Sequence, residues 1–250
     1  MKINPAAGLA LFSLLSATAF AQGTSLTRSE VAAIKAKLVT VQQAMGADPS
    51  GYLKEEEDFD LPTDSNPAQG GKFWPITSGI SLRYTDRASA EGTANAEKAA
   101  EEFQAKYAAA AASGNVEALT KMIEDMQRAQ AAAMAPAVKK EDMQVYVQFN
   151  QNPSVGIDPD AVVLEQPGVI ALREKQASSE TGSVTVYIDP VALKATQELS
   201  KIELRTADDG VSNKTGIFHV VIQTNGTVAD LESWVKGFDF DAMLGVIDPR

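Results

Sequence analysis

Residues 88–137 constrain the fold more than any other stretch, because 19 of these 50 residues are alanine. Alanine is the strongest helix former, so this composition predicts helix rather than strand. The run is interrupted at Ser113-Gly114-Asn115, where glycine suits the residue after a helix end and asparagine can cap the next helix. We therefore expect an Ala-rich helical hairpin that ends at Pro136, or one long helix with a break at Gly114.

The second of these helices has an adaptable apolar face. Its methionines are Met122, Met126 and Met134, and flexible thioethers beside small alanines let a surface fit several apolar partners. This predicts a docking surface for a protein or small apolar partner. The alternative is that the face packs on its hairpin mate and on the rest of the fold.

The N-terminal part of the chain predicts one amphipathic helix within residues 22–46. Thr27 and Glu30 have the spacing of a capping box, and Gly46 stands where a helix would end. Apolar residues recur between them at steps of three and four, at Val31, Ile34, Leu38, Val41 and Met45.

Residues 47–78 lose this periodicity and are rich in acidic residues, proline and glycine. We predict an acidic Pro/Gly-rich loop. Its densest cluster, Glu55 to Asp60, indicates weak divalent cation binding by carboxylate oxygens. The cluster lacks the alternating spacing of a calcium loop, so a solvated charge run is the alternative.

The remaining segments predict mainly strands. In residues 79–137, Ile80, Leu82 and Tyr84 alternate with polar residues ahead of the hairpin. Residues 138–250 form a β-rich region with strands near 145–149, 169–172, 184–188, 202–204 and 217–222, a helix over 190–199, a turn at 225–227 and a final helix. The predicted fold is α+β, an N-terminal helix and an Ala-rich helical hairpin packed with a mostly antiparallel C-terminal sheet. Residues 79–250 as one domain is an alternative to this division.

The composition excludes several function classes. The chain has no cysteine, which removes disulfides, thiolate metal sites and cysteine nucleophiles. Its single histidine, His219, removes every multi-histidine metal site. A formal net charge of -11 argues against nucleic acid as a partner and would attract cationic partners or divalent ions instead. The alternative is that the acidic surface simply keeps an exported protein soluble.

The first 21 residues predict export. Lys2 precedes a short apolar stretch, and small residues, Ala19 and Ala21, occupy the two positions that a signal peptidase reads. This is the pattern of a bacterial signal peptide cleaved between Ala21 and Gln22. The apolar stretch is too short to span a bilayer, and no later segment predicts a transmembrane anchor. The expected location is the periplasm or the exterior.

Candidate site residues are few. His219 sits in the most apolar predicted strand, which is typical of a packed residue more than of a general base. Asp158-Pro159-Asp160 and Asp208-Asp209-Gly210 match turn chemistry. No nucleophile elbow, phosphate loop or dinucleotide fingerprint is present, so we nominate no catalytic, cofactor-binding or metal residue.

The sequence therefore predicts an exported, soluble and non-enzymatic module that binds a partner or ligand. One alternative is a carboxylate-based hydrolase of cell-envelope or glycan substrates, since two acids suffice for that chemistry. Another is an envelope scaffold that assembles through an apolar face.

Overall fold

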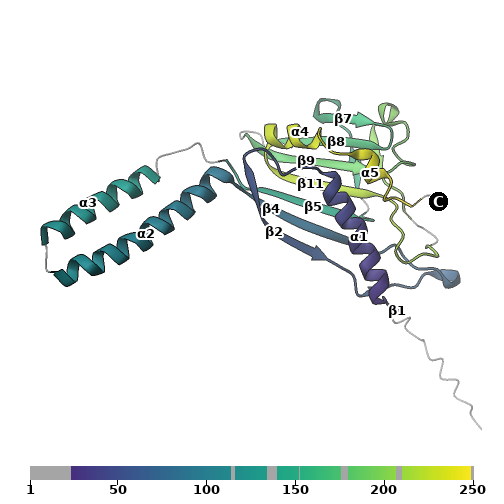
Figure 1. The fold of residues 1–250 in the computed structure, drawn as a ribbon. Helices are drawn as coiled ribbons and strands as arrows, with labels where there is room; N and C mark the ends of the chain where they lie inside the picture. The colour runs from purple at the N-terminus through teal and green to yellow at the C-terminus, as the bar shows by residue number, and fades with distance from the viewer. Residues whose placement is uncertain are drawn as a thin grey trace, which may run out of the picture.

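The computed structural model describes residues 24–113, 116–133, 140–151, 153–175, 180–206 and 210–248. The predicted signal peptide lies outside these residues. Seven antiparallel strands form one sheet in the order β2-β4-β5-β11-β9-β8-β7 (Figure 1). Their bounds are β2 Tyr52–Asp60, β4 Ser78–Asp86, β5 Met143–Phe149, β7 Val162–Gln166, β8 Val169–Lys175, β9 Thr181–Ile188 and β11 Val220–Thr227.

Three helices cover one face of this sheet, here called the covered face (Figure 1). They are α1 (Arg28–Ala44), α4 (Val228–Val235) and α5 (Phe240–Leu244). The predicted capping box is present at α1, where the Thr27 backbone N–H donates to Glu30 at 2.7 Å and the Glu30 N–H donates to the Thr27 hydroxyl at 3.2 Å. The buried stripe of α1 is Ile34, Leu38, Val41 and Ala44.

The opposite face is covered only in part. Two short strands, β6 (Ser154–Gly156) and β10 (Lys201–Glu203), pair with each other beside a second cluster of buried residues. That cluster is Ile170, Leu172, Tyr187, Leu193, Ile202, Leu204 and Val221. Over β2, β4 and β5 most of the outward side chains are polar, and we call this part the open face. The short strands β1 (Thr24–Ser25) and β3 (Asp64–Ser65) form a separate pair.

The mixed α+β class is confirmed, with a large antiparallel sheet. The sheet is not only C-terminal, however, because β2 and β4 come from the first third of the chain. The prediction of an acidic loop over 47–78 is wrong in its central part, since residues 52–60 are the edge strand β2. Tyr52 and Phe59 face the core and the backbone pairs with β4, while the carboxylates stay in solvent. Strand geometry allows this alternation even where propensity opposes it.

Two local predictions in the C-terminal region are also wrong. Residues 190–199 contain turns and the short 3₁₀ helix Thr196–Glu198 instead of an α-helix. Asn225–Thr227 is the end of β11 and not a turn, because it still pairs with β9. The strand predicted over 217–222 begins at Val220, and the final helix is confirmed as α4. At Asn225–Thr227, pairing with β9 overrode the local turn signal.

Two further helices, α2 (Arg87–Ser113) and α3 (Val116–Ala133), lie side by side and extend away from the sheet (Figure 1). We call them the helical arm. The arm was expected to pack with the sheet, but no described residue of α2 or α3 belongs to either core cluster. Alanine explains this difference, because each methyl group buries little apolar area. In the described part of the chain, no helix combines the length and apolarity needed to cross a membrane.

Candidate functional site

A groove crosses the open face at the β2 edge of the sheet. It has a volume of about 440 Å³, and its walls come from three adjacent strands. We call it the acidic groove and define it by the outward residues Asp58 and Asp60 of β2, Gly79 and Ser81 of β4, and Tyr146 and Gln148 of β5.

The groove exists because the middle strand carries its smallest side chains there. Ser81 pairs with Asp58 on one side and with Tyr146 on the other, so a short residue lies between two longer ones. Gly79 has no room for a larger residue, since an added Cβ would lie 2.8 Å from the Val147 carbonyl oxygen. A Gly-x-Ser segment on β4 is therefore the floor of the groove.

The two acidic side chains of the groove are exposed, and neither has a hydrogen-bond or ion-pair partner in the described ranges. The next residue along the same face of β4 is Arg83, which lies 3.1 Å from Asp142, 3.7 Å from Glu55 and 3.8 Å from Glu56. The hydrogen bond and the charge of Asp142, with the charges of both glutamates, raise the pKa of Arg83. The open face thus already holds one guanidinium between carboxylates.

A second hollow of about 600 Å³ continues the open face across β5, β11 and β9. Glu141, Asp142 and Glu174 stand in its lining, together with amides such as Gln144 and Gln223. Carboxylates therefore line both hollows of this face.

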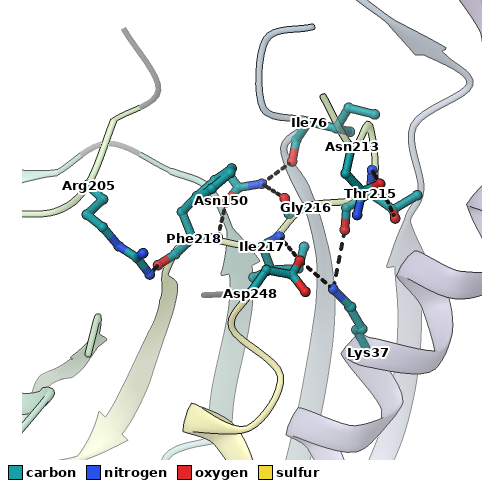
Figure 2. Close-up of polar contacts among 10 residues, drawn as sticks. All are labelled: Lys37, Ile76, Asn150, Arg205, Asn213, Thr215, Gly216, Ile217, Phe218 and Asp248. Carbon is teal, nitrogen blue, oxygen red and sulfur yellow. Dashed lines mark hydrogen bonds and ion pairs between the residues drawn. The ribbon is translucent and has the colours of Figure 1, made fainter. Parts of the chain in front are cut away.

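A polar junction around Asn150 lies next to the acidic groove in the chain, between the lining residues Phe149 and Gln151. Figure 2 shows the contacts of this junction. The Asn150 side-chain amide donates to the carbonyls of Ile76 and Gly216, both at 2.9 Å, and its oxygen accepts the Phe218 N–H at 2.9 Å. Asn150 itself adopts φ 57°, a left-handed conformation that asparagine tolerates better than most residues. Its neighbours Phe149 and Gln151 line the groove, so the junction fixes that wall.

The same junction is tied to the N- and C-terminal parts of the domain. Lys37 of α1 donates to Asp248 at 2.8 Å and to the Thr215 carbonyl at 3.4 Å (Figure 2). Asp248 also accepts the Ile217 N–H at 2.8 Å. These bonds hold the segment 213–218 between α1 and the sheet.

His219 lies in the interior and not in the groove. It is 1% exposed, and its Nε2 donates to the Gln151 carbonyl. Burial lowers the pKa of His219 and so favours the neutral ring at pH 7, while this hydrogen bond acts in the opposite direction. Its Nδ1 is buried without a hydrogen-bond partner among the described residues, and the packed position that the sequence predicted for this histidine is confirmed.

The other sequence candidates fall in different places. Asp158 caps the 3₁₀ helix Pro159–Ala161 by accepting the Asp160 N–H at 3.0 Å, the turn role that was predicted. Met122 and Met126 lie on α3, while Met134, Asp208 and Asp209 lie outside the described residues. The carboxylates of residues 55–60 are divided between the two faces of β2, and among the residues described none forms a group of three that could hold a metal ion.

Sequence reasoning missed Gly79, Ser81, Tyr146 and Gln148 as site residues. Their one signal was the alternation of Tyr146 and Gln148 with valines, which marks an exposed strand face. Which strands are neighbours is decided by tertiary pairing, and the groove arises only from that pairing.

No protein-family model, curated protein or solved structure matches this chain.

Proposed function

We propose that this protein is an exported, non-enzymatic binding module that holds a cationic group of a partner or ligand in the acidic groove. The observation that carries the proposal is the contrast along β4. At Arg83 the open face supplies its own guanidinium to the surrounding carboxylates. Two and four residues before Arg83 on β4, at Ser81 and Gly79, the paired residues of β2 are Asp58 and Asp60. Among the described residues, no Lys or Arg side chain pairs with these two carboxylates.

The groove chemistry suits a guanidinium or ammonium group. The carboxylates accept charge-assisted hydrogen bonds, and Gln148 adds an amide acceptor. Tyr146 is 37% exposed on the opposite wall, where its ring can face a cation. Such a contact contributes about 0.5–1 kcal/mol at an exposed site. The net charge of -11 would attract a cationic partner from a distance.

The same geometry favours binding over the alternative of a carboxylate hydrolase. Glycoside hydrolysis needs two acids that flank the scissile bond from opposite sides. Asp58 and Asp60 are two residues apart on one strand and form a single wall. The facing wall is Tyr146 and Gln148, which carry no carboxylate.

The combined substitution Asp58→Asn and Asp60→Asn tests the groove. With agmatine as the probe, we expect the affinity measured by NMR titration to fall about tenfold or more, because two charge-assisted contacts are lost. The matched control removes two exposed carboxylates from α2, Glu97→Gln with Glu101→Gln, so the net charge changes equally. If both double variants lost the same affinity for agmatine, the loss would come from the change in net charge and not from the groove, which would contradict the proposal.

We further propose that the Ala-rich helical hairpin predicted over 88–137 binds an apolar partner through the helical arm. What supports this is a groove of about 380 Å³ between α2 and α3, lined by Ala96, Ala99, Phe103, Met122 and Met126. Tyr107 and Ile123 are more than 40% exposed nearby.

Filling the arm groove provides its test. We expect Ala99→Trp to reduce the fluorescence gain of an apolar dye such as 8-anilinonaphthalene sulfonate by about half or more, since the bulky ring occupies the dye's volume. Ala88→Trp, on the first turn of α2 outside this groove, is the control. Unchanged dye binding in Ala99→Trp would contradict a role for this surface.

A further inference from the structure

The outermost strand of the sheet, β2, has one free edge. It pairs with β4 along residues 52–60 and stands at the end of the strand order. Unpaired N–H and C=O groups on an edge strand are a template for another extended chain. Because β2 is nine residues long, the template is long enough for several backbone hydrogen bonds.

The hydrogen-bond pattern identifies which amides point outward. The Asn150 N–H donates to the backbone carbonyl of His219, just before β11. Every second residue of β5, counted back from Asn150, therefore directs its backbone N–H and C=O toward β11, and the residues between them direct theirs toward β4. When the same alternation is continued across β4, the backbone N–H and C=O groups of Asp58 and Asp60 point toward Ser81 and Gly79. The Arg87 N–H bonded to the Gly51 carbonyl at 2.8 Å agrees with this phase.

The amides of Glu57 and Phe59 must therefore point to the free edge, because bonded and outward residues alternate along an antiparallel strand. A register shift at Lys54–Glu56 ends this regular stretch on the other side. The free edge of β2 is thus defined by Glu57 and Phe59.

The charges beside this edge select the partner. Glu57, on the covered face, accepts hydrogen bonds from Lys54 at 2.6 Å and Gln42 at 2.8 Å, so it is already paired. Asp58 and Asp60, on the open face, have no such partner in the part of the chain that is described. A second copy of β2 would bring further acids against these and be repelled, since like charges across strands are destabilising.

Only one face of an added strand needs to carry basic side chains. Side chains two residues apart on a strand lie on the same face, roughly 7 Å apart. An added strand would need Lys or Arg at alternate positions to meet Asp58 and Asp60. Its other face would lie beside Phe59, whose ring already carries Lys35 at 4.4 Å from its centroid, so uncharged residues fit there.

We propose that β2 takes an extended segment of a partner polypeptide as an eighth strand, with Lys or Arg at every second residue facing the acidic groove. This rests on the proposed function, because the same groove carboxylates receive the cations. It adds that the ligand is a peptide chain held through its backbone.

The probe is an acetylated, amidated heptapeptide that alternates Thr and Lys. Its first control has the same composition with the three Lys residues adjacent, and its second has N-methyl groups on alternate amides. We expect each control to bind about tenfold more weakly, because it loses either the side-chain spacing or the backbone donors. In the complex, the amide hydrogens of Glu57 and Phe59 should exchange about tenfold more slowly, as newly bonded strand amides do.

Variants at one position separate backbone pairing from charge. Glu57→Pro removes an outward N–H that proline can lack on an edge strand, and should weaken the alternating peptide about tenfold while leaving agmatine binding unchanged. Glu57→Gln removes the charge, keeps the N–H and should retain peptide binding. If Glu57→Pro does not fold, the N-methyl peptide still decides the question on the unaltered protein.

The outcomes distinguish the two proposals. Equal binding of the alternating and N-methylated peptides, or unchanged exchange at Glu57 and Phe59, overturns strand addition. Agmatine binding that is insensitive to Asp58→Asn and Asp60→Asn overturns the groove proposal instead.

Discussion

Replacing Asn150 by alanine should lower the free energy of unfolding by about 4 kcal/mol or more, the sum of two physical effects. The first is the loss of three hydrogen bonds, which leaves the Ile76 and Gly216 carbonyls and the Phe218 N–H unsatisfied in a buried site. Each such group costs about 1–3 kcal/mol. The second is the left-handed φ of 57°, which costs an alanine about 1 kcal/mol more than it costs asparagine or glycine.

Urea denaturation of Asn150→Ala and Asn150→Gly separates the two effects. Glycine accepts the backbone conformation, so Asn150→Gly should be about 1 kcal/mol more stable than Asn150→Ala and still well below the unsubstituted protein. If both variants were as stable as the unsubstituted protein, the Asn150 junction would not hold the groove wall in place. The expected consequence of its loss is weaker binding of agmatine as well.

Asp189→Ala should destabilise the fold by a similar amount, about 3–5 kcal/mol, because it breaks a buried ion pair from one side. Asp189 is fully buried, and its Oδ1 lies 2.8 Å from Nε of Arg205. The same carboxylate accepts the backbone N–H groups of Val191 at 2.9 Å, Ala192 at 3.0 Å and Arg205 at 2.8 Å. Alanine leaves these backbone donors without an acceptor and the Arg205 guanidinium without its counter-charge, although its Nη2 still donates to the Phe218 carbonyl.

The control for this prediction removes the other partner. Arg205→Met keeps the acceptor for three backbone amides and should cost less than Asp189→Ala in the same denaturation experiment. The double variant should recover part of the loss of Asp189→Ala, because no unpaired guanidinium then remains. A double variant less stable than Asp189→Ala alone would show that the guanidinium is not what penalises the single change.

Local signals were sufficient for the elements whose residues interact within a few positions. The capping box of Thr27 and Glu30 and the apolar stripe of α1 predicted that helix to within two residues. Alternation did the same for β4 and β5, where every second side chain enters the core. These features depend on spacing along the chain, which the sequence shows directly.

Long-range pairing decided the rest. The sequence predicts a solvated loop at residues 55–58, because four consecutive acids disfavour a strand. These residues are nevertheless part of β2, because the strand pairs with β4 and because Tyr52 and Phe59 pack against the core. The acidic groove could not be predicted for the same reason. Its floor is on β4 and its walls are on β2 and β5, and only the fold shows that these strands are adjacent.

Insertions and deletions have different effects in the helical arm and in the two strands to which the arm is joined. β4 and β5 are paired neighbours, with Tyr84 opposite Met143, so the chain leaves the sheet for α2 and returns to it at a single point. Residues gained or lost within the arm therefore leave the register of all seven strands unchanged. A residue gained within β4 or β5 would instead exchange the covered and open faces beyond it. The arm can change in length over generations of the gene while the sheet keeps its register.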